Sequence, residues 1–205
     1  MTTPEAEALF AQTLLGDYEG EDAWAAVSAL RLDGSRQIFE RAAEWCLSDN
    51  PLKRARATAI LCQLQRAPVT HALANKPEWM FRDESYPLLT KMLEDEQDPT
   101  VLDSVICALG HLDDTRAIPL IVRYEDHPDK DVRFAVSFAL GSFPNDAQSI
   151  YSLLKLTLDP DADVRDWAVF GLGVQGMPTR LKFAKPSYDL WRIRTKTFAR
   201  KLQLA

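Results

Sequence analysis

Histidine and cysteine are the side chains in this sequence best suited to metal binding or nucleophilic catalysis, and their spacing predicts neither. The 205 residues contain three of each. They form no HExxH motif and no CxxC pair, the local patterns that place metal ligands or a redox pair close together. We therefore predict no metal site, no cofactor and no disulfide framework. The residues concerned are His71, His111, His127, Cys46, Cys62 and Cys107.

Acidic residues are the next candidates for chemistry. The pair Asp113–Asp114 and the run from Asp159 to Asp163 could act as general acids or bases. Both lie between predicted helices, where aspartate commonly forms turns and caps helix N-termini. We favour the turn and cap role. The sequence also lacks a P-loop, a GxGxxG motif and a GxSxG motif, so nothing local indicates a nucleotide site or a serine nucleophile.

The charge is divided unevenly along the chain. The formal net charge is −6, but residues 174–205 hold eight basic residues and one acidic residue, or +7, which leaves −13 on residues 1–173. Nucleic acids and anionic membranes bind through Lys and Arg. We therefore expect a protein or peptide partner for the acidic body, and no nucleic acid or membrane. The basic segment could dock on that body, contact an acidic partner or be frayed.

Three features of the sequence bear on the cellular location: the length of its apolar stretches, its N-terminal segment and the placement of its cysteines. No apolar stretch approaches the roughly 18 residues that a membrane span needs. The segment from Met1 to Phe10 has no Lys or Arg, unlike the start of a secretory signal. Each cysteine lies in an apolar helical run, which is typical of small buried residues in a reducing compartment. We predict a cytoplasmic protein.

An internal repeat dominates the sequence. Segments 99–110, 130–141 and 162–173 share a helical run that ends in Leu-Gly, and in the second and third segments this run begins with Asp-Val-Arg. Their terminal glycines are 31 and 32 residues apart. A fixed period of this length indicates a solenoid, in which each unit buries its apolar face only against its neighbours.

Each part of the pattern has a physical reason. Asp131 and Asp163 stand where a carboxylate can cap free N–H groups at the start of a helix. The apolar residues that follow recur at i, i+3, i+4 and i+7, which is one helical face. Gly141 and Gly173 can take the left-handed conformation that ends a helix.

Further helical runs complete the array. Between the three copies, 115–124 and 148–158 read as the partner helices of each unit, and weaker copies cover 4–15, 21–32, 36–47 and 50–62. We count about five helical pairs and predict a solenoid over 1–176 with an inserted loop at about 65–83. Residues 177–205 form a divergent basic segment, in which 191–204 can make a helix that caps the last repeat.

The Asp-Val-Arg start, the small-residue helix and the Leu-Gly end at this spacing resemble HEAT repeats. The similarity is closest to the short repeats of phycobilisome lyases and of stand-alone bacterial HEAT proteins. It covers roughly residues 20–173. The resemblance implies an all-α fold, the right-handed α-α superhelix of a HEAT-repeat solenoid. It also implies that the second helix of each pair lines the concave face, the usual binding surface of such arrays.

The candidate binding residues are those on the second helices that the repeat pattern would turn toward solvent. Phe134, Phe138 and Phe170 form an aromatic stripe there, which is either a partner surface or packing between repeats. Arg133 and Arg165 either contact the partner or join a ladder of bonds to neighbouring aspartates. The full set of partner-binding candidates is Trp24, Arg54, Arg133, Phe134, Phe138, Arg165, Asp166 and Phe170.

The function predicted from these features is a non-catalytic scaffold or adaptor that binds a protein through the concave face. Three alternatives remain. A phycobilin-lyase-like enzyme or subunit is suggested by the subtype of the repeats, although no bilin site is evident. An immunity-type inhibitor of one protein partner would use the same surface. A HEAT-like DNA glycosylase would need a basic groove, which a local stripe of Arg54, Arg56, Arg133 and Arg165 could supply although the body is acidic.

Overall fold

The chain folds into stacked helical pairs. The computed structural model describes residues 1–64 and 80–174, and in that part of the chain it contains helices and no strands. Five pairs follow one another, as the repeat pattern predicts. The helices are α1 Thr3–Gln12, α2 Glu21–Asp33, α3 Arg36–Trp45, α4 Pro51–Leu61, α5 Arg82–Asp95, α6 Pro99–Leu112, α7 Ile118–Ile121, α8 Lys130–Leu140, α9 Ala147–Leu156 and α10 Ala162–Val174, with short 3-10 turns η1 Thr115–Ala117 and η2 Val122–Tyr124.

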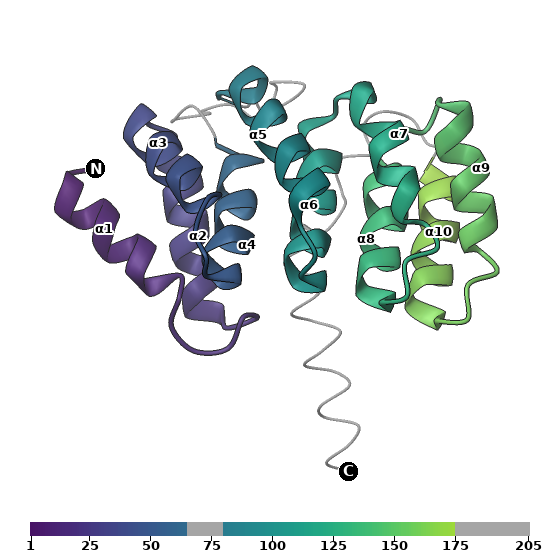
Figure 1. Cartoon of the computed structure of the whole chain (residues 1–205), viewed down its shortest axis with the longest axis horizontal. Helices are drawn as coiled ribbons and strands as arrows, with labels where there is room; N and C mark the ends of the chain where they lie inside the picture. Colours follow the sequence, from purple (N-terminus) through teal and green to yellow (C-terminus); the bar gives the residue numbers. More distant parts are fainter. Residues whose placement is uncertain (65–79, 175–205) are drawn as a thin grey trace, which may run out of the picture.

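Two layers of helices result from this pairing. The second helices of the pairs form one layer, in which α2 packs on α4, α4 on α6, α6 on α8 and α8 on α10. Figure 1 shows α4, α6, α8 and α10 side by side, with α9 and α10 at the C-terminal end of the stack. The first helices α1, α3, α5 and α9 each pack against the second helix of their own pair. The result is the α-α solenoid that the sequence predicts.

Acidic or amide residues begin four of the second helices. The side chains of Asn50, Asp98, Asp129 and Asp161 each accept hydrogen bonds from two backbone N–H groups of the first turn. Such caps are worth about 1 kcal/mol each. Asp131 and Asp163 lie in the first turns of α8 and α10, as predicted, where a carboxylate meets the positive end of the helix dipole. The N-cap itself is the residue two positions earlier, Asp129 or Asp161.

Two glycines of the second helices allow close helix approach. A Cβ at Gly110 would lie 2.7 Å from the Cα of Ala139, and a Cβ at Gly141 would lie 3.3 Å from the Cα of Gly171. The predicted left-handed role of Gly141 is wrong, because its φ is −61°. A glycine suits this place because a Cβ here would crowd the neighbouring backbone of Gly171.

Three further expectations differ from the structure or lie outside it. The expected inserted loop extended to residue 83, but helix α5 begins at Arg82. The run 115–124 is split into η1, α7 and η2 and does not form one continuous helix. The remainder of that loop, 65–79, and the segment 177–205 lie outside the described residues.

The glycine contacts predict a position-specific effect of one methyl group. Gly110→Ala should lower the free energy of unfolding by about 1–3 kcal/mol, because its Cβ would overlap the backbone of Ala139. Gly173→Ala is the control. Its added Cβ would meet no atom of the described chain within 4 Å, so better helix propensity should leave stability unchanged or raise it by up to about 1 kcal/mol. Urea unfolding of the two variants measures the difference, and equal effects would refute the packing argument.

Candidate functional site

An arginine on α8 joins two successive repeats. Arg133, four residues after its N-cap, donates from Nη1 to the carbonyls of His127 and Pro128 at 2.9 and 3.1 Å. Its Nε and Nη2 donate to the two carboxylate oxygens of Asp159, at 2.7 and 3.0 Å. Asp159 belongs to the next repeat and lies two residues before the N-cap of α10. One guanidinium therefore holds the turn of its own repeat and the turn of the following one.

The same arrangement occurs near the N-terminus. Arg54, four residues after its N-cap, donates to the carbonyls of Ser48 and Asp49 at 2.9 and 3.2 Å. Its remaining nitrogens bind both oxygens of Glu96 at 2.7 and 3.0 Å, and Glu96 lies two residues before the N-cap of α6. We call these rungs the arginine ladder: the pairs Arg54–Glu96 and Arg133–Asp159. The predicted ladder role of Arg133 is confirmed, and Arg54 shares it.

The ladder has one gap and one open end. Between α6 and α8, Leu102 stands at the arginine position and His127 at the carboxylate position, so no rung forms. On α10, Arg165 donates to the carbonyls of Asp159 and Pro160 at 2.7 and 2.9 Å, as Arg133 does to its own turn. Within the described residues, no carboxylate of a further repeat meets Arg165. It is a rung with one side only.

The ladder carboxylates are charged at neutral pH. Burial by itself raises the pKa of Asp159, but hydrogen bonds from Arg133 and the Asp161 backbone N–H outweigh it and hold the pKa below its usual value. Glu96 behaves alike. Its burial is outweighed by hydrogen bonds from Arg54 and from backbone N–H groups, so that its pKa is also lowered. Both pairs are largely shielded from water, which makes them stronger than ordinary surface ion pairs.

The aromatic stripe is packing between repeats at two of its three positions. Phe134 and Phe138 are only 7% and 3% exposed, and both rings lie against Trp167, with ring centroids 5.6 and 5.7 Å apart. Of the two interpretations, the structure bears out inter-repeat packing for this pair. They would not meet a partner as solvent-exposed rings. Phe170, at 39% exposed, is the member that reaches the surface.

Trp24 is buried as well. It packs against Arg56, which the sequence did not mark as a structural residue. The guanidinium of Arg56 lies 4.8 Å from the Trp24 ring centroid and 4.4 Å from that of Tyr18. It donates to the carbonyls of Thr13 and Tyr18 at 2.9 and 2.7 Å. Arg56 thus fixes the connection between α1 and α2. With Arg56 buried and the ladder arginines bound, the predicted basic stripe for DNA does not form.

The exposed apolar side chains concentrate in the last repeat. Five of the nine large hydrophobic residues that are exposed in the described chain lie on α9, on α10 or in the turn between them. Val169 is 57% exposed, although its counterpart in α8, Ser137, is fully buried beneath α10. These five residues are Tyr151, Leu154, Leu158, Val169 and Phe170.

The side of α10 that faces away from α8 is therefore a distinct surface. Counted from the helix start, its residues occupy the positions that in α8 contact the next repeat or are buried beneath it. We call this surface the α10 end face. It comprises Arg165, Asp166, Val169, Phe170 and Gly173. Three of the predicted binding candidates, Arg165, Asp166 and Phe170, come together here.

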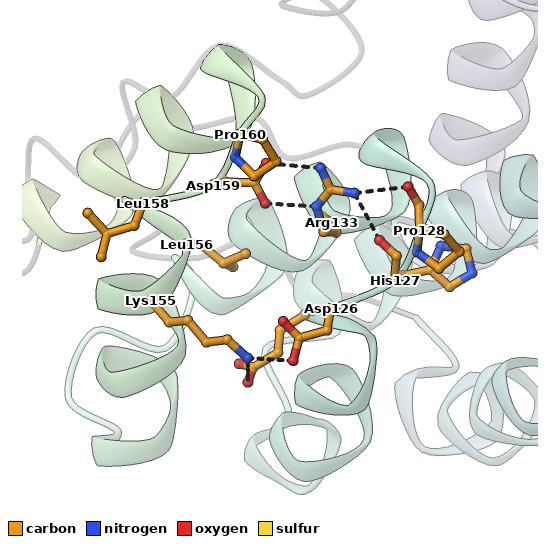
Figure 2. A pocket seen from close by; sticks show the side chains of 10 residues that line it. Asp126, His127, Pro128, Arg133, Lys155, Leu156, Leu158, Asp159 and Pro160 are labelled. Atoms are coloured by element: carbon orange, nitrogen blue, oxygen red, sulfur yellow. Dashed lines mark hydrogen bonds and ion pairs between the residues drawn. The ribbon is translucent and has the colours of Figure 1, made fainter.

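A cavity of about 420 Å³ lies at the joint between the last two repeats. Figure 2 shows Arg133 and Asp159 on one side of it and Lys155 on the other. Lys155 pairs with Glu125 and Asp126 at 2.8 and 2.5 Å. The charged groups that line the cavity are thus bound to one another, an arrangement suited to joining repeats.

The histidines and cysteines of the described chain take part in packing. The Nδ1 atom of His127 accepts from the Asp129 backbone N–H, and His111 contacts the side chains of Gln63 and Phe138. His71 lies outside the described residues. All three cysteines are buried thiols, and burial raises the pKa of Cys46 to about 12. The described residues include no group of three or more His, Cys, Asp or Glu that could hold a metal ion.

The fold and the ladder define a class, the α-α solenoid of stacked helical pairs. Residues 86–173 match the HEAT repeats family, so this part of the chain consists of HEAT repeats. The match is to HEAT repeats in general and gives no particular support to the phycobilisome-lyase subtype.

One solved structure shows the same fold over nearly the whole chain. The X-ray structure of YibA from Escherichia coli aligns with a TM-score of 0.60 and 20% identity, and the alignment covers 94% of this chain and 68% of YibA. At that identity the likeness concerns the fold alone. Among curated proteins, none matches this sequence. No helix within the described residues is long and apolar enough to span a membrane.

The ladder predicts unequal effects for two equivalent arginines. Arg133→Ala should lower the free energy of unfolding by about 3 kcal/mol, because it leaves the shielded Asp159 carboxylate without its cation. Arg165→Ala removes the same carbonyl contacts without breaking a rung, and should cost about 1 kcal/mol. Urea unfolding of both variants measures the inter-repeat contribution. Equal losses would mean that Arg133 stabilises only its own turn.

The ladder also predicts acid sensitivity. Because the folded-state pKa values of Asp159 and Glu96 are lowered, their stabilisation is complete above the unfolded values of about 4 and is lost as pH falls through the folded values. The free energy of unfolding should therefore decline below about pH 4. The decline should be shallower in Asp159→Asn than in the wild type, and unchanged in Asp17→Asn, an exposed control. Urea titrations across pH 6 to 2.5 measure this, and parallel curves for wild type and Asp159→Asn would contradict it.

Proposed function

We propose that this chain is a non-catalytic protein-binding scaffold and that its partner binds the last helical pair. The observation that carries the proposal is the concentration of exposed apolar side chains in the α9–α10 pair. Two of them, Val169 and Phe170, occupy positions whose counterparts in α8, Ser137 and Phe138, are buried. Exposed apolar clusters of this kind are typical of interaction sites. HEAT repeats supply the rigid support that such a surface needs.

The charges around this surface indicate the chemistry of the partner. Asp163 and Asp166 are exposed on α10, and Asp126 is exposed across the nearby turn. A partner with an apolar centre and basic residues at its rim would complement this arrangement, as in ordinary protein interfaces. The binding surface therefore differs from the predicted concave aromatic stripe, whose members Phe134 and Phe138 are buried.

The remaining polar groups support a role in binding and not in catalysis. The buried or partly buried charges at the joints are used in pairs that hold repeats together. The Cys46 thiol, with its raised pKa, is a poor nucleophile. Buried thiols also fit a reducing compartment such as the cytosol.

The test is affinity capture from a native lysate with matched variants. The Val169→Asp/Phe170→Asp double variant should lose at least about tenfold of the captured partner, because it places charge in the apolar centre of the interface. Leu47→Asp changes an exposed leucine in the turn between α3 and α4, away from the last described pair, and should capture the partner as the wild type does. Circular dichroism checks that all three proteins are folded. Equal capture by both variants would rule out this surface.

A further inference from the structure

We infer that the α10 end face accepts a HEAT-type helical pair from the partner protein. The second helix of that pair carries a carboxylate two residues before an Asp or Asn N-cap. This inference rests on the proposed function, because it names the class of partner that the last repeat binds. It follows from comparing equivalent positions of α8 and α10, one contact at a time.

The first contact is the ladder. Arg133 holds its own turn with Nη1 and uses Nε and Nη2 for the carboxylate of the following repeat. Arg165 holds its own turn in the same manner, with Nη1 on the carbonyls of Asp159 and Pro160. Within the described residues, no carboxylate is bonded to the Nε and Nη2 atoms of Arg165, the atoms with which Arg133 binds Asp159. A carboxylate there would complete a bidentate pair.

The second contact is the close approach of backbones. Gly110 and Gly141, twelve residues after their N-caps, each have the backbone of the next second helix within 3.3 Å of the position of a Cβ. Gly173 is the equivalent residue of α10, and a Cβ built there meets no atom of the described chain within 4 Å. Gly173 thus has the same small surface as the glycines of the stacked helices, and no described helix lies upon it.

The third contact is apolar. Phe138 is buried against Trp167 of the next repeat, with ring centroids 5.7 Å apart, whereas its equivalent Phe170 is 39% exposed. At α10, therefore, one side of each of three contacts is present: the arginine of the ion pair, the glycine of the backbone approach and the ring of the aromatic contact. Their spacing is that of one repeat, so a helical pair of the same type fits all three together.

The complete pairs of the arginine ladder indicate which residues the partner's helix should carry. The acceptors occur as Glu96-Gln97-Asp98 and Asp159-Pro160-Asp161, an acid, any residue and then the N-cap. Ten residues after the N-cap stands a small residue, Ala139 or Gly171, which meets the glycine of the preceding helix. The partner should show this acid-x-Asp start and a small residue at that spacing.

Two other occupants lack this chemistry. Residues 175–205 contain a single acidic residue, Asp189, and the position two residues after it is Trp191, which cannot cap a helix. A second copy stacked head to tail would present α2, whose N-cap is Gly20 and whose carboxylate position is Tyr18. Neither supplies an acid two residues before a capping side chain, so a separate protein is the occupant that the ladder specifies.

The experiment uses the full chain and, as a probe, a synthetic peptide with the sequence of residues 142–174, which carries Asp159, Asp161 and Gly171. Because a single pair does not fold alone, the probe should become helical as it binds. Titration calorimetry should show saturable binding, and circular dichroism should show a gain of helix on mixing. Arg165→Ala should weaken it about tenfold, the usual effect of losing a charge-assisted bidentate pair. A probe with Asp159→Asn should bind the wild-type chain about tenfold more weakly, and Arg165→Ala should weaken that probe no further.

A second variant tests the backbone contact without disturbing the fold. Gly173→Leu adds a side chain into space that is open in the described chain, so its melting temperature should match that of the wild type. The same leucine would block the close approach of a stacked helix, and probe binding should fall by at least tenfold. Leu47→Asp, in the turn between α3 and α4, should bind the probe normally.

Several outcomes would overturn the inference. One is an absence of probe binding, and another is binding that Arg165→Ala and Gly173→Leu leave unchanged. Equal, non-additive melting losses for Arg165→Ala and Asp189→Asn would assign the face to residues 175–205. A dimer in sedimentation equilibrium that Gly173→Leu abolishes would assign it to a second copy. If the partner captured from lysate is lost by Val169→Asp/Phe170→Asp but retained by Arg165→Ala and Gly173→Leu, the proposed function stands and this inference fails.

Discussion

Each helical pair of this protein buries one side only when the next pair stacks upon it, and the rest of the structure depends on that constraint. A single pair has too little apolar surface to fold alone, so stability must come from the joints between pairs. The joints are made where second helices meet. There, Gly110 and Gly141 bring backbones together, and Arg54 and Arg133 carry hydrogen bonds from one turn to the next.

The joints are not identical, and their differences compensate. Where α6 meets α8, Leu102 and His127 replace the ladder pair, yet this joint has the closest glycine contact, with 2.7 Å between a Cβ built at Gly110 and the Cα of Ala139. Where α8 meets α10, the Arg133–Asp159 pair is present and the glycine contact is looser. Close packing and charge-assisted hydrogen bonds thus serve as alternative means of fixing the same geometry.

The same constraint explains why the last helix carries the candidate site. Residues that join repeats in the middle of the stack become exposed at its end, because no later pair among the described residues covers them. Arg165, Phe170 and Gly173 are therefore proposed as binding groups because of their position in the stack, and not because of a separate motif. A partner that binds at α10 would have to satisfy ionic, aromatic and backbone contacts at one spacing, as a neighbouring repeat does at an internal joint. Its binding would therefore be as specific as the stacking of two repeats.

The sequence by itself determined the repeat, the helical class and the places of most helices, because period, caps and apolar spacing are local properties of the chain. It also indicated that Arg133 bonds to a neighbouring acid. It did not reveal helix α5, which begins at Arg82 within the expected inserted loop and contains Pro87. The pattern correctly placed Asp131 and Asp163 in the first turns of α8 and α10, but it did not single out Asp129 and Asp161 as the residues that cap these helices.

Only the tertiary structure decided which side chains face solvent. Phe138 and Phe170 occupy the same position of the same pattern, but α10 covers the first and no described helix covers the second. Arg56 looked like its ladder neighbour Arg54, yet it is buried between Tyr18 and Trp24. The exposure of a side chain depends on which segments from elsewhere in the chain pack against it. Because the repeat pattern is alike in every unit, it does not show whether a further unit covers a given side chain.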